Sequence, residues 1–394
     1  MPQLTMRTLA PLGARHRAAK PTEGKDWSVE SLRGLALVLM VAGHVIGDTP
    51  ERGLGAGNGT FLREAYLVLV DVRMPFFTFL SGYVYAMRPL GPRSELSLFL
   101  RAKSRRLLMP MVAVGLLFMA VQKMIPGTNA NAGRGDLLRL LFFGYEHLWF
   151  LQSVFLIFVV IAMLDLRGLL SRPALWGAAF ALGLVAYFAV QLPAHANLFS
   201  LNQACMLFPF FLLGLGLRRF SGRAPDGALP VLLLTVWAAA TMLVQMWVRD
   251  TGTVLPRVPG QALGMVVGMC SVCAFFGLRD ALANPVLRWL GKYSYGVYLL
   301  HVFGAAGARI VLERLGVGST AVLFAGALVA GLTAPVLVEV TAGRIPVVAT
   351  VMFGRRWTGP GPPVRRRQGK HRASRRQTRP EGKHVNPQWA RTSG

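Results

Sequence analysis

Two ionisable residues, Arg33 and His44, interrupt the first long apolar stretch of the chain. They are eleven positions apart, which at about 100° per residue is within roughly 20° of three full helical turns, so both side chains share one helical face. The rise of about 16 Å puts Arg33 near an interface and His44 near the middle of a membrane. An imidazole at that depth needs a partner or a water-filled cavity, and its unperturbed pKa of about 6.5 suits it to proton exchange; a structural hydrogen bond is the alternative.

Polar residues also mark the next two apolar stretches. Asp71 and Arg73 stand at the outer end of the second, where they form a local ion pair or contribute to substrate binding. Ser81 lies deeper in the same stretch, before a glycine that permits close helix approach. Arg105 and Arg106 belong to a basic cluster that opens the third stretch. The distribution of positive charge across a membrane accounts for that cluster, and guanidinium groups also bind phosphates bidentately.

Four further polar or aromatic residues lie within later apolar stretches. Trp149 opens the fourth, where a tryptophan usually anchors a helix at the interface. Tyr298 and His301 are three positions apart on one helical face and are candidates for an internal hydrogen-bond network. Glu339, in the last apolar stretch, is a carboxylate that must find a partner in the membrane.

The composition places these residues in lipid. Of 394 residues, 53% are hydrophobic and 15% charged, and the mean hydropathy is +0.46. Apolar runs of roughly 18 to 20 residues recur, as membrane-spanning helices require. We predict an all-α fold, a polytopic membrane helix bundle of about ten transmembrane helices, near residues 34–50, 68–87, 107–126, 147–165, 174–192, 201–217, 230–248, 261–278, 293–312 and 320–341.

The positive residues predict the orientation. Lys and Arg gather in alternate connections, so both termini should face the cytoplasm. We expect a basic cytoplasmic segment over 1–33, a transmembrane domain over 34–342, and a basic, disordered cytoplasmic tail over 343–394 that adsorbs to anionic lipid headgroups or is merely solvated. The net charge of +26 lies between the apolar runs and in this tail, so no nucleic-acid partner is expected. No removable signal peptide is recognisable at the N-terminus.

The three cysteines give no sign of a metal centre. Cys205, Cys270 and Cys273 all lie inside apolar runs, and the C-x-x-C that two of them form has no second ligand pair nearby. We therefore expect no metal.

Six segments, in this order, resemble the membrane-bound acyltransferase family three, the polytopic bacterial O-acyltransferases that modify surface glycans or small molecules. The resemblance covers roughly residues 27 to 342. It rests on the R-x10-H pair of Arg33 and His44 and on FLSGY (79–83), RRLLMP (105–110), LWFL (148–151), FPFF (208–211) and SYGVYLLH (294–301). The chain differs from the family in lacking the proline that often follows Glu339 by two residues, and in carrying a basic tail in place of an appended hydrolase-like domain.

The resemblance implies a reaction. Arg33 and His44 would be the catalytic pair. The donor would be acyl-CoA on the cytoplasmic side, and acetyl-CoA is the donor most frequent in the family. Arg33, Arg105 and Arg106 would bind the phosphates of coenzyme A, and His44 would act as base or as acyl relay toward a hydroxyl of a carbohydrate or glycosylated small molecule. A multi-pass protein of the plasma membrane, acting on the cell envelope, is implied.

A transporter or flippase is the competing class. In that reading Arg33, His44 and Glu339 would form a substrate or proton path rather than a catalytic site. Inverted repeats would favour it, and we detect none in the sequence.

Overall fold

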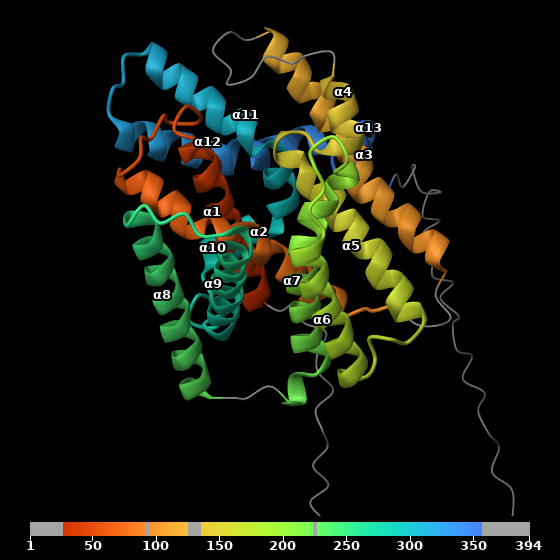
Figure 1. Cartoon of the computed structure of the whole chain (residues 1–394). Helices are drawn as coiled ribbons and strands as arrows, with labels where there is room; N and C mark the ends of the chain where they lie inside the picture. The colour runs from red at the N-terminus through yellow and green to blue at the C-terminus, as the bar shows by residue number, and fades with distance from the viewer. Residues whose placement is uncertain (1–26, 91–94, 125–134, 224–226, 357–394) are drawn as a thin grey trace, which may run out of the picture. The chain divides into compact units, whose positions relative to one another are not determined.

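The structure is a computed structural model that describes residues 27–90, 95–124, 135–223 and 227–356. Within those residues the chain forms helices and turns and no strand (Figure 1). Residues 1–26 and 357–394, which hold most of the expected N-terminal basic segment and of the expected tail, lie outside the described residues.

Among the described residues, ten apolar helices make up the bundle, as the hydropathy predicts. They are α1 (Trp27–Ile46), α2 (Phe61–Tyr85), α3 (Leu96–Met124), α5 (Trp149–Leu166), α6 (Pro173–Ala189), α7 (Leu201–Arg219), α8 (Ala228–Asp250), α9 (Arg257–Gly277), α11 (Ser294–Arg314) and α12 (Thr320–Thr341). In the described part of the chain, nine apolar helical segments are long enough to cross a membrane, and α6 is a shorter apolar helix. The all-helical, polytopic architecture is thereby confirmed.

Shorter elements connect these helices. They are α4 (Asp136–Leu138), α10 (Pro285–Lys292), α13 (Pro346–Val351), a π-helical turn at Arg139–Phe143, and 3-10 turns at Glu146–Leu148, Leu198–Ser200, Ser221–Arg223 and Ala342–Arg344. The turn at Glu146–Leu148 leads directly into α5, which matters for the site described below.

Helix α1 packs among α2, α10, α11 and α12 (Figure 1). Residues 27–33 are already helical, ahead of the expected start at 34, and α10 packs against these turns, with Gly291 against the backbone of Glu30. Ser31 is buried in that contact and its hydroxyl donates to the carbonyl oxygen of Asn284, 3.3 Å away. Arg33 therefore lies within a packed helix and not at a frayed helix end.

Helix α2 lies directly against α7. A side chain at Gly82 would collide with the backbone of Phe211, and one at Gly214 would collide with the backbone of Phe79. The two glycines let the helix backbones approach closely. In a membrane the hydrophobic effect does not drive helices together, so such close packing is a main source of helix–helix association. Ser81, beside Gly82, donates its hydroxyl to the carbonyl oxygen of Phe77 one turn earlier, at 2.9 Å.

An ion pair between partly buried Arg219 and buried Asp165 joins α7 and α5, and Tyr85 connects it to α2. Arg219 binds Asp165 bidentately, with N···O distances of 2.8 and 3.1 Å, and donates to the carbonyl oxygen of Leu170 at 2.9 Å. The hydroxyl of Tyr85 donates to the same carboxylate at 2.7 Å. Because charge and hydrogen-bonding groups are matched, this network can be buried without an uncompensated charge.

Candidate active site

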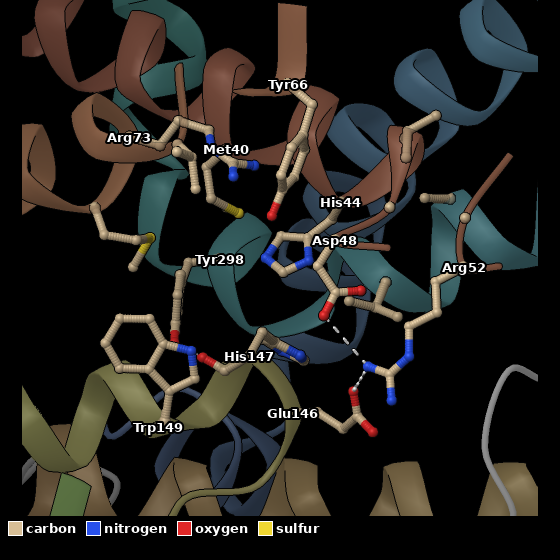
Figure 2. A pocket seen from close by; sticks show the side chains of 18 of the residues that line it. Met40, His44, Asp48, Arg52, Tyr66, Arg73, Glu146, His147, Trp149 and Tyr298 are labelled. Carbon is tan, nitrogen blue, oxygen red and sulfur yellow. Dashed lines mark hydrogen bonds and ion pairs between the residues drawn. The ribbon is translucent and has the colours of Figure 1, made fainter. Parts of the chain in front are cut away.

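A cavity of about 520 Å³ opens beside the C-terminal half of α1 (Figure 2). Its walls come from α1, α2, α3 and α11, with further residues from the segment before α5 and from α6, α7, α9 and α12. Of the residues singled out in the sequence, His44, Asp71, Arg73, Trp149 and Tyr298 line it. The cavity therefore gathers residues that are more than 250 positions apart in the chain.

His44 meets two other histidines in the wall of this cavity. Its ring centroid lies 4.9 Å from that of His301 and 6.0 Å from that of His147, and the latter two are 5.0 Å apart. His44 itself is exposed, and because it lines the cavity its accessible surface faces the interior space. His147 and His301 are buried behind it, with 5% and 0% of their surface exposed. His147 also lines the cavity, but of the three imidazoles His44 is the most exposed to it.

The two buried rings are held by backbone carbonyls. A carbonyl oxygen can only accept, so His147 must donate its Nε2–H to the oxygen of Leu299 at 3.3 Å. His301 likewise donates its Nδ1–H to the oxygens of Tyr298 and Val297, at 2.9 and 3.2 Å. In these neutral tautomers Nδ1 of His147 and Nε2 of His301 keep a lone pair, and neither atom has a hydrogen-bond partner.

Those two lone pairs are chemically useful beside His44. An imidazole that takes up a proton acquires a second N–H, and a neighbouring neutral imidazole nitrogen can accept it. The cluster is not arranged as a metal site: in the described part of the chain no group of three or more His, Cys, Asp or Glu residues could hold a metal ion.

A tight turn brings His147 into the cluster. Glu146 has a positive φ of 44°, uncommon for a residue with a side chain, and it precedes the first turn of α5. The turn points Glu146 toward Arg52 and His147 toward His44 (Figure 2). Tyr298 secures it, because its hydroxyl donates to the carbonyl oxygen of His147 at 2.5 Å. The expected polar network of Tyr298 and His301 thus also contains His147.

Asp71 and Arg73 line the cavity but do not pair with each other. Asp71 accepts a hydrogen bond from Gln245 at 2.5 Å and lies 3.9 Å from Arg249. Residues two apart on a helix point in different directions, so a local pair was sterically disfavoured. Arg73 instead places its guanidinium 4.3 Å from the ring centroid of Tyr66.

Three charged side chains form an exposed rim of the cavity. Arg52, in the connection from α1 to α2, lies 3.5 Å from Asp48 and 3.9 Å from Glu146 (Figure 2). Their side chains are 44%, 56% and 28% exposed, respectively. Sequence reasoning missed this rim, because its members come from a connection and a turn that carry no periodic pattern.

The other predicted residues gather elsewhere. Arg33, Arg105, Arg106 and Glu339 are not part of the lining of the His44 cavity. Arg33 is within electrostatic range of Arg106, and the guanidinium of Arg106 lies 5.6 Å from the ring of Tyr295. Arg105 borders a separate, open depression along α3.

Glu339 has a partner beyond the last long helix. Arg355, which follows α13, donates to its carboxylate at 2.5 Å. Arg106 also acts electrostatically on Glu339, so the carboxylate belongs to the basic cluster of Arg33 and Arg106. Arg33 and Glu339 therefore both lie outside the cavity that His44 lines. Ser81 does not line the cavity either, and its hydroxyl donates to its own helix.

Comparison with known proteins gives one result. A family model described as an acyltransferase domain matches residues 26–340, which is most of the chain and contains both the histidine cluster and the basic cluster. Searches of curated proteins and of solved structures returned no significant match.

Proposed function

Because the chain belongs to the family of membrane acyltransferases that this match defines, we propose that it transfers an acyl group from acyl-CoA to a hydroxyl group. The donor is acetyl-CoA at the cytoplasmic face of the plasma membrane, and the acceptor is a carbohydrate or glycosylated small molecule of the cell envelope. The observation that carries the proposal is the exposure of His44 to a cavity, next to two buried imidazoles.

His44 acts on the acceptor. As a base, it takes the hydroxyl proton while the acceptor oxygen bonds to the acyl carbon; the C–S bond then breaks, and the thiolate of coenzyme A leaves and recovers that proton. As a relay, a His44 nitrogen first bonds to the acyl carbon and expels the thiolate; the acceptor oxygen then bonds to that carbon, the C–N bond breaks to restore the neutral ring, and the hydroxyl proton goes to the thiolate. In both routes His147 and His301 accept the N–H of the charged ring and so stabilise it.

The basic cluster binds the donor. Arg33, Arg105 and Arg106 supply guanidinium groups for the phosphates of coenzyme A. Arg33 is eleven residues before His44 on α1, a rise of about 16 Å, which the flexible pantetheine arm of coenzyme A can span. Arg355 neutralises Glu339 and so reduces the repulsion that this carboxylate would exert on the phosphates.

The acceptor enters from the opposite end of α1, over the rim of Asp48, Arg52 and Glu146. Carboxylates accept hydrogen bonds from hydroxyl groups, and Trp149 gives the cavity an aromatic wall. Asp71 contributes a third carboxylate deeper inside.

The lipid bilayer is the remaining partner, and we propose that the basic tail binds its anionic headgroups.

Transfer of label from radiolabelled acetyl-CoA to an acceptor tests this function. Membranes containing the protein are incubated with radiolabelled acetyl-CoA and an extract of the source cells' glycans and secreted metabolites, and label is sought in that extract. His195, exposed on the connection between α6 and α7 and outside the cavity, offers a matched control. Label that depends on His44 and not on His195 is expected. Movement of an unlabelled solute across the membrane with no acylated product would support a transporter instead.

A further inference from the structure

The guanidinium group of Arg73 lies beside His44 and has no role in the acyl transfer as proposed so far. It lies on α2 and lines the cavity, although only 8% of its surface is exposed. Its guanidinium occupies the space that a side chain on Gly43 would fill, directly adjacent to His44 in the sequence. Figure 2 shows Arg73 and Tyr66 on one side of the His44 ring and His147 on the other.

Arg73 carries its charge without a carboxylate. No ion pair within 4.0 Å involves it in the described part of the chain, and its Nε has no hydrogen-bond partner. The three acidic residues that line the cavity are already engaged, Asp71 with Gln245 and Arg249, and Asp48 and Glu146 with Arg52. The ring of Tyr66 provides only partial compensation, through a cation–π contact.

Guanidinium stays protonated under all physiological conditions, so burial does not relieve this charge by neutralising it. A buried cation with no counter-ion is unfavourable unless a negative group completes the site. The position of the guanidinium against Gly43 puts that negative group next to the reactive imidazole. The structure therefore offers a place where negative charge is stabilised within reach of His44.

We propose that Arg73 is a catalytic residue that stabilises the oxyanion of the acyl-transfer intermediate. The inference rests on the proposed acyl transfer. When the acceptor oxygen, or a His44 nitrogen, bonds to the acyl carbon, the electron pair of the C=O π bond moves to the carbonyl oxygen. Arg73 donates N–H hydrogen bonds to that oxygen without giving up a proton. The pair then re-forms the C=O bond, and the C–S bond breaks with its electrons leaving on sulfur.

This role explains why residue 43 is a glycine. A methyl group there would collide with the guanidinium and push it away from His44. A matched control exists in Gly177 of α6, where an added side chain would meet nothing within 4 Å. Gly43→Ala and Gly177→Ala therefore make the same chemical change on a helix, but only the first should displace Arg73.

The test measures kcat and KM of the purified protein, with acetyl-CoA as donor and the labelled acceptor fraction from the experiment above. Arg73→Gln should lower kcat about 10²- to 10³-fold, the loss typical of one missing oxyanion donor, and leave both KM values within about threefold. Arg73→Lys should retain part of the rate because it retains the charge. Gly43→Ala should lower kcat and Gly177→Ala should not.

Chemical rescue separates catalysis from folding. Guanidinium ion added to Arg73→Ala protein should restore part of the lost kcat, which a merely structural role of Arg73 would not allow. A normal kcat in Arg73→Gln protein would overturn the proposal. So would a rise in the KM for the acceptor at constant kcat, because it would mean that Arg73 binds an anionic group of the bound acceptor. If the wild-type protein transfers no acyl group, the proposed function itself fails.

Discussion

Arg73, which is buried, and Arg219, which is partly buried, show opposite ways of keeping a cation inside this helix bundle. Arg219 has a bidentate carboxylate partner in Asp165, a carbonyl oxygen, and a tyrosine hydroxyl on the same carboxylate. Arg73 has an aromatic ring and a cavity. A satisfied charge stabilises the fold and is closed to ligands, whereas an unsatisfied charge costs stability and remains available to a reacting group.

Substitution of each arginine by a residue of similar length tests this contrast most strongly. Arg219→Met should lower the free energy of unfolding by about 3–5 kcal/mol, because it leaves Asp165 as an unpaired buried charge. Arg73→Met should leave stability unchanged or raise it, because no carboxylate loses a partner. Thermal unfolding in detergent measures both. Equal destabilisation by the two substitutions would remove the distinction between the two sites.

Substitution of Asp165 should have the second largest effect on the free energy of unfolding. Asp165→Asn keeps the shape of the side chain and removes the charge that Arg219 and Tyr85 share, so we expect a loss of about 2–4 kcal/mol, with normal kcat in whatever protein remains folded. The same unfolding assay, with kcat measured on the monodisperse fraction, checks it. A folded Asp165→Asn protein with a lowered kcat would show that the network also acts on the active site.

The histidines behind His44 should influence rate and not stability. His301→Ala removes an acceptor for the charged His44 ring, and loss of a hydrogen bond to a charged group costs about 1.5–3 kcal/mol, or about 10- to 100-fold in rate. We expect kcat to fall by that factor while KM for acetyl-CoA is unchanged. His301→Asn, which can still accept a hydrogen bond, should recover part of the rate. Identical kcat in both variants would argue that His301 only fills space.

The rim should give the smallest effect. Arg52 is 44% exposed, and ion pairs of exposed side chains contribute about 0–1 kcal/mol, so Arg52→Ala should leave the unfolding temperature almost unchanged. It should raise the KM for the acceptor a few-fold, because Asp48 and Glu146 lose the charge that positions them. A change in the KM for acetyl-CoA alone would place the rim on the donor side instead.

The helices of the bundle were predictable because a helix that crosses lipid needs about 20 consecutive apolar residues, and runs of that length are easily recognised in the sequence. The short helix α10 was not predicted, because its eight residues are too few for a membrane-spanning run, yet it packs closely against α1. The shared face of Arg33 and His44 also followed from helical geometry alone, since only positions along one helix are involved.

The assembly of the site was less predictable. The meeting of His44, His147 and His301 depends on three segments folding together and on the left-handed turn at Glu146, which no local pattern encodes. His147 was visible as a histidine at the start of an apolar run, and that was the signal that could have assigned it. The choice of Gln245 and Arg249 as partners of Asp71 likewise depends on how α8 packs against α2.

The most direct measurement is the rate of acyl transfer from radiolabelled acetyl-CoA by purified His44→Ala protein, compared with wild type and with His195→Ala. Removal of a general base typically lowers the rate about 10²- to 10⁴-fold. We predict a loss in that range for His44→Ala, with the protein still folded and in the membrane, and an unchanged rate for His195→Ala. Normal product formation by His44→Ala protein would contradict the assignment of His44 as the group that carries out the transfer.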